Sequence, residues 1–188
     1  MSLRDALCSS APVFLFGTVP AMEGTEKAKI QQQAQKFSAK MRELAADGYI
    51  VYDIQEEKGR TNDPRPFPFR RMSDPVEYAA MLKEASGKDS VVYKCVAEHV
   101  GEPFAEWTTR TKRVHGVDCL NLVGGATSSV TYSGPTIAEA AGAVAKQDMV
   151  FGGVTIAERH LKRKNEHQLI ASKVAAGSQW FISQFNNP

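Results

Sequence analysis

Apolar runs rich in β-branched residues recur at roughly even intervals along the chain. Each run is long enough for one strand, and its apolar residues are continuous rather than alternating with polar ones. This pattern is typical of strands buried on both faces of a parallel sheet. The six runs are Val13–Val19, Tyr49–Gln55, Val91–Ala97, Cys119–Gly125, Met149–Ile156 and Trp180–Phe185.

The segments between these runs have helical spacing. In the first of them, apolar or small residues recur every three or four positions, and Gly48 follows as a C-terminal stop. The expected helices are Thr25–Asp47, Val76–Ser86, Glu102–His115, Thr136–Lys146 and Gln168–Gly177. The charged segment Glu158–His167 is expected to be a polar connection after the fifth strand. The sequence therefore predicts an α/β protein with the order β(αβ)₅.

Two sheet arrangements fit this order: a doubly wound open sheet, or part of an eight-stranded (β/α)₈ barrel. Both place the site at the carboxyl ends of the strands. The longest insertion, Glu56–Met72, follows the second strand and would shape the mouth of such a site. Periodicity alone leaves both arrangements open.

Composition narrows the functional classes. A chain of 188 residues with a net charge of +2 indicates one domain, and neither nucleic acid nor an anionic membrane is expected as a partner. No apolar stretch is long enough to span a bilayer. Three cysteines without CxxC spacing favour a reducing, cytoplasmic setting. The histidines show no metal-ligand spacing, so no metal site is predicted.

Polar residues near the ends of the last two strands are candidates for ligand binding. Gln184 ends a strand beside apolar side chains, which suits a flat, amide-bearing ligand such as a pterin. Thr155 and His160 follow the preceding strand. Gly124 and Gly125 end the fourth run, where glycine lets a ligand approach the backbone closely.

Four segments, in order along the chain, resemble one enzyme family. They are Phe14–Pro20, Val117–Gly125, Gly152–Ile156 with Glu166 and Lys173 after it, and Ala175–Gln184. The whole chain resembles the amino-terminal two-thirds of methylenetetrahydrofolate reductase, a flavin-containing (β/α)₈ barrel. The resemblance implies a single barrel domain over residues 1–188 with the last two βα units missing. We therefore expect a fragment, or a homo-oligomer in which another chain covers the gap.

The resemblance also implies a site. Substrate contacts to a reduced folate are expected from Gln184, Gln55 and Phe185. The cofactor FAD, reduced by NAD(P)H, is expected to contact Gly124, Gly125, Thr155, His160, Glu166 and Lys173.

Three positions depart from the family. Gly17 stands where the family has its acidic proton donor, Ala126 where it has an aspartate beside the flavin, and Lys94 where it has a histidine that touches the flavin. A carboxylate at Asp53 or Glu56 could replace the missing acid, although a salt-bridged loop is the commoner arrangement.

The first hypothesis is an oxidoreductase of one-carbon metabolism. The alternative is a folate-binding or methyl-transfer protein without flavin chemistry, and unrelated barrel chemistry is a third option.

Overall fold

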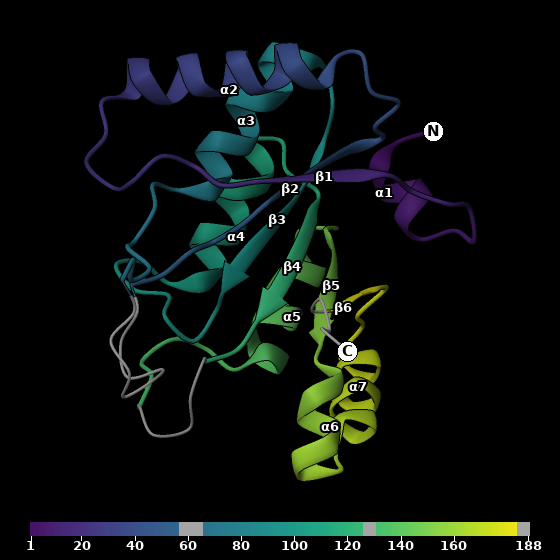
Figure 1. Cartoon of the computed structure of the whole chain (residues 1–188). Coiled ribbons are helices and arrows are strands. Elements are labelled where there is room, and N and C mark those ends of the chain that lie inside the picture. Colours follow the sequence, from purple (N-terminus) through teal and green to yellow (C-terminus); the bar gives the residue numbers. More distant parts are fainter. Residues whose placement is uncertain (57–65, 126–130, 184–188) are drawn as a thin grey trace.

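The computed structural model describes residues 1–56, 66–125 and 131–183. Its centre is a six-stranded sheet in which all neighbouring strands are parallel and follow the order β1-β2-β3-β4-β5-β6. The strands are β1 (Leu15–Thr18), β2 (Gly48–Val51), β3 (Ser90–Cys95), β4 (Cys119–Val123), β5 (Val150–Thr155) and β6 (Phe181–Ser183). The sheet curls into a half-barrel (Figure 1). The doubly wound alternative is wrong, because its strand order reverses at a switch point and this order does not.

Helices alternate with the strands, as the sequence predicts. They are α1 (Leu3–Leu7), α2 (Lys27–Met41), α3 (Pro75–Ser86), α4 (Phe104–Arg113), α5 (Ile137–Lys146), α6 (Ala157–Arg163) and α7 (Glu166–Ala175). The main core lies between the sheet and the helices that follow its strands. There, Val51 and Leu120 of the sheet belong to one buried cluster with Leu82 of α3 and Val144 of α5. This helix-covered side is the outer face of the half-barrel.

The opposite, inner face has its own apolar cluster at the amino ends of the strands. Leu3 of α1 packs there against Val91 and Cys119. Ser2 and Asp5 form a capping box that begins α1, and Arg4 pairs with Asp148 across 2.8 Å. No element was expected before Val13, because α1 is too short to show a helical period.

A second difference concerns the charged segment after β5. Its first half is the helix α6, not an irregular connection. No residue of α6 is buried, so the helix has no apolar stripe from which it could be predicted. In the last strand the described pairing covers Phe181–Ser183, and the last two residues of the expected run, Gln184 and Phe185, lie outside the described residues.

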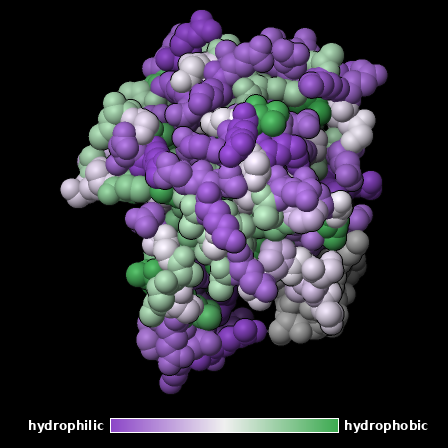
Figure 2. All heavy atoms as spheres, turned by 180° about the vertical axis from the view of Figure 1, so that it is seen from behind, coloured by the Kyte–Doolittle hydropathy of each residue, from purple (hydrophilic) through white to green (hydrophobic). Residues whose placement is uncertain are grey.

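The surface of the described part gives no sign of a bilayer-spanning element. None of its helices has both the length and the apolar character needed to cross a membrane. The face seen in Figure 2 is largely hydrophilic, with hydrophobic residues in scattered patches.

Candidate functional site

Strand alternation decides which side chains face the inside of the half-barrel. Because Val51 and Leu122 lie under the helices, their neighbours Tyr52 and Asn121 point to the inner face. The sheet register then places Tyr93 of β3 beside Asn121, and Asn121 beside Gly152 of β5. These inward-facing residues form one layer across the middle of the sheet.

Aromatic rings fill this layer. The Tyr52 and Tyr93 rings lie 5.0 Å apart between centroids. A side chain at Gly17 would come within 2.8 Å of the Tyr52 ring, and one at Gly152 would overlap the Trp180 indole nitrogen. Glycine at both positions therefore makes room for a ring over the backbone. We call Gly17, Tyr52, Tyr93, Asn121, Gly152 and Trp180 the inner layer.

Asn121 is the polar member of the inner layer. Its side chain is fully buried, with 0% exposure, and neither its amide oxygen nor its amide nitrogen has a hydrogen-bond partner among the described residues. Buried amides are normally paired, so this one is unusual. The periodicity of the β4 run could not reveal it, because asparagine sits within a continuous buried strand.

The predicted acid Asp53 lies where β2 and β3 separate. Its carboxylate accepts hydrogen bonds from the Cys95 N–H at 2.8 Å and from the Gln55 amide at 2.5 Å. Burial raises the pKa of the Asp53 carboxyl, while Lys94 and the Cys95 N–H act against this. Asp53 thus links the diverging strands, and Gln55 is turned toward it.

Three further residues near this end of the sheet, Cys95, Glu56 and Lys94, do not supply a reactive group to the inner layer. Burial raises the pKa of the Cys95 thiol to about 11, so Cys95 is a neutral thiol near pH 7 and not a nucleophile. Glu56, the second candidate acid, is exposed. Lys94 points to the outer face, where its ammonium lies 5.0 Å from the centre of the Trp107 ring on α4. It is therefore separated by the sheet from the inner layer.

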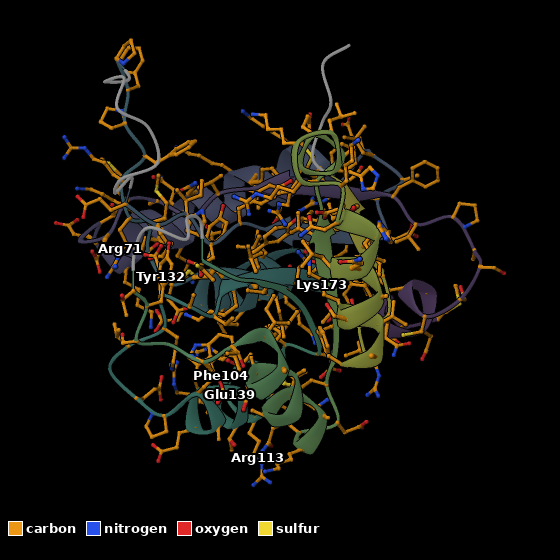
Figure 3. All side chains as sticks on the ribbon, turned by 90° about the horizontal axis from the view of Figure 1, so that it is seen from below. Arg71, Phe104, Arg113, Tyr132, Glu139 and Lys173 are labelled. Atoms are coloured by element: carbon orange, nitrogen blue, oxygen red, sulfur yellow. The ribbon has the colours of Figure 1, made fainter. Side chains whose placement is uncertain are left out.

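The glycines at the end of β4 are packed by protein. A side chain at Gly125 would overlap the ring of Tyr132, which is labelled in Figure 3, and the Cys95 thiol lies 3.6 Å from the Gly124 carbonyl oxygen. The Tyr132 ring therefore covers the end of β4 at Gly125. Ala126 lies outside the described residues, as do Gln184 and Phe185.

Glu166 and Lys173, expected at a flavin, make contacts within the protein. Glu166 is buried and accepts the Ile156 N–H at 2.9 Å, while its other oxygen faces Arg159 at 3.5 Å. The Lys173 ammonium donates to the Val154 carbonyl at 2.5 Å, with its stem against Gly153 (Figure 3). Burial lowers the pKa of Lys173.

The remaining cofactor candidates lie around α6. Thr155 is half-buried at the end of β5 and aligned with Ser183 of β6. His160 is exposed on α6, with its ring 5.5 Å from that of His167. The structure therefore brings Thr155, Glu166 and Lys173 to the carboxyl end of β5, but leaves His160 on a solvated helix.

Grooves also occur away from the inner layer. The larger of two that we measured has a volume of about 410 Å³ and follows α2 on the outer face, beside Lys29, Lys36 and Lys40. In the inner layer, the space beside Gly17 is occupied by the Tyr52 ring and the space beside Gly152 by the Trp180 indole.

Comparison with known proteins yields a likeness of fold. No family model and no curated protein sequence matches the chain. A solved structure described as an uncharacterized protein from Clostridium thermocellum that binds two copies of 5-methyl-5,6,7,8-tetrahydrofolic acid is similar, with a TM-score of 0.74 and 24% identity. The match covers 99% of this chain and 59% of that chain. The chain thus shares the fold of a protein that holds a reduced folate.

Proposed function

We propose that this chain binds a reduced folate on the inner face of its half-barrel. The inner layer carries the proposal, because it combines flat aromatic rings with a buried, unpartnered amide at Asn121. A pterin is a planar heterocycle with carbonyl and N–H groups on one edge, and such a site offers it stacking and pairing together. The fold likeness to a protein that binds 5-methyltetrahydrofolate selects the ligand to test first.

The residues of the inner layer would make different contacts with the pterin. Tyr52 and Tyr93 present ring surface, and the Asn121 amide offers one acceptor and two donors. Gly17 lets the Tyr52 ring lie close to the backbone of β1. Binding and orientation follow from these groups, whereas proton transfer at Gly17 does not.

A flavin-dependent reductase is the second candidate. It is favoured by the placement of Thr155 and Lys173 together at the end of β5, where the resemblance implies the cofactor FAD. FAD would supply hydride chemistry, with NAD(P)H as its reductant. Three features weigh against it: Gly17 has no acid, Glu166 is committed to Ile156 and Arg159, and Lys94 lies on the outer face. We therefore place folate binding ahead of reduction.

A thermal-shift titration tests the proposal. At a ligand concentration of ~100 Kd, binding stabilises the folded state by ~2.7 kcal/mol. For a chain of this size that is a rise in Tm of roughly 5–10 °C. We expect this rise with 5-methyltetrahydrofolate, and none with FAD. A yellow protein with flavin absorbance would favour the reductase, and no response to any reduced folate would overturn the proposal.

Matched ring deletions locate the binding face. Tyr52→Leu removes one ring of the inner pair, whereas Phe37→Leu removes one ring of the outer Phe37–Tyr49 pair, whose centroids are 5.5 Å apart. Stacking on an aromatic ring contributes ~0.5–1.5 kcal/mol beyond area burial, so Tyr52→Leu should weaken binding roughly 3- to 10-fold. Phe37→Leu should leave the affinity unchanged although it lowers stability.

A further inference from the structure

Two buried polar groups of the inner layer have no hydrogen-bond partner within residues 1–56, 66–125 and 131–183, and both lie beside one glycine. They are the Asn121 amide on β4 and the Trp180 indole N–H at the start of β6. Register places Asn121 beside Gly152, and the indole nitrogen lies over Gly152 itself. The Gly153 N–H donates to the Trp180 carbonyl at 3.0 Å, so the backbone of Trp180 is fixed beside β5.

A purely structural role does not explain Asn121. The neighbours of Asn121 on β4 are Leu120 and Leu122, and valine is an apolar, strand-favouring residue whose volume is nearer to that of asparagine than leucine's is. An apolar residue would fill the position without leaving two polar atoms unpaired, and leaving them unpaired opposes folding. Asparagine therefore costs stability in the unliganded protein, and a ligand that pairs with it would recover that cost.

The group that fits is the edge of a lactam or pyrimidinone ring. An amide side chain has an acceptor and a donor side by side, so it pairs with an adjacent carbonyl and N–H through two hydrogen bonds. The Trp180 indole is a flat, fused two-ring system next to this amide. The space that the indole fills therefore has the shape needed for a flat two-ring ligand.

We propose that the Asn121 side chain hydrogen-bonds the ligand at the base of the ligand site. We also propose that the Trp180 indole fills the ligand-binding space until the ligand binds. This inference rests on the proposed function. It adds Asn121 as the residue that determines ligand specificity and the Trp180 indole as the group that moves on binding. The pterin edge pairs with Asn121, and the indole turns away from Gly152.

Substitution of Asn121 separates binding from folding. In Asn121→Val we expect the unliganded protein to be more stable to urea than wild type, and the Kd for 5-methyltetrahydrofolate to rise at least tenfold. Thr111→Val is the matched control: the Thr111 hydroxyl is equally buried and unpartnered but lies on α4, behind the sheet. It should leave the affinity unchanged.

The movement of Trp180 has its own signal. The chain has two tryptophans, so in a Trp107→Phe background the fluorescence reports Trp180 alone. Saturation with 5-methyltetrahydrofolate should change the emission and expose the indole to acrylamide quenching. If the wild type binds but the affinity is unchanged in Asn121→Val, or if that variant is less stable than wild type, the further inference is overturned and the proposed function is not. Failure of the wild type to bind any reduced folate would overturn the proposed function as well.

Discussion

At the scale of single residues, the site divides into groups already bonded within the protein and groups still unpaired. Asp53, Glu166 and Lys173 each meet a backbone group, and these contacts account for their burial. The Asn121 amide has no such contact in the part of the chain that the structure describes. The proposed ligand contacts therefore lie in the inner layer, whereas the charged residues that the sequence singled out are already bonded within the protein.

Glu166 gives the first prediction. Glu166→Ala should lower the free energy of unfolding of the unliganded protein by ~1–3 kcal/mol, because the Ile156 N–H loses its acceptor and Arg159 its counter-charge. Urea denaturation measures this, with Glu84→Ala, an exposed carboxylate on α3, as the control. Unchanged stability in Glu166→Ala would show that the buried carboxylate is free for another role.

Gly152 gives a second prediction through its contact with Trp180. A methyl group at this position must displace the indole, so Gly152→Ala should destabilise the protein by ~1–3 kcal/mol. Gly142→Ala is the control with the opposite sign. That glycine lies in α5 with no atom near its added Cβ, and alanine there should stabilise the helix by roughly 0.5–1 kcal/mol. Equal effects of the two substitutions would contradict the packing of Trp180 over β5.

His99 gives a prediction for pH. Burial, followed by the nearby Lys94, lowers the pKa of His99 below its ordinary value of 6.5. The unfolded chain therefore takes up a proton more readily than the folded protein, and stability is lost as the pH falls from 6.5 toward the folded-state pKa. His99→Gln should flatten this part of the urea-stability profile between pH 7 and 5, whereas His160→Gln on the exposed α6 should retain it. A profile unchanged by His99→Gln would contradict the account.

At the scale of elements, sequence patterns predicted all the strands and the five longest helices. The predictions succeeded where burial produces a regular pattern of apolar residues, as in β4 and α2. They failed at α1, which is one turn long, and at α6, which buries no residue. Strand bounds were too long at the carboxyl ends because apolar residues continue into loops such as that at Gly125.

The packing of α1 can be tested directly. Leu3 is 5% exposed and fills the amino end of the inner face against Val91 and Cys119, so Leu3→Ala should cost ~2–5 kcal/mol. Leu161→Ala on α6 removes a side chain that is 79% exposed and should change stability by less than ~0.5 kcal/mol. Equal melting temperatures for the two variants would mean that α1 does not contribute to the core.

At the scale of the whole molecule, the strand order decides between the doubly wound sheet and the partial barrel, which periodicity could not distinguish. Six parallel strands in sequential order form a curled half-barrel, and the chain spans 59% of the structure to which it is similar. The site that the sequence predicted at the carboxyl ends of the strands stays a prediction. The sequence could not find the inner layer, because which residues of adjacent strands meet depends on register, and an unpaired amide is a property of three-dimensional packing.

The central claim is that the inner face binds a reduced folate. The most direct measurement is isothermal titration of the protein with 5-methyltetrahydrofolate, for the wild type and for Tyr52→Leu and Phe37→Leu. We predict saturable binding that weakens in Tyr52→Leu and is retained in Phe37→Leu. Absence of binding by the wild type, or equal loss of affinity in both variants, would contradict the claim.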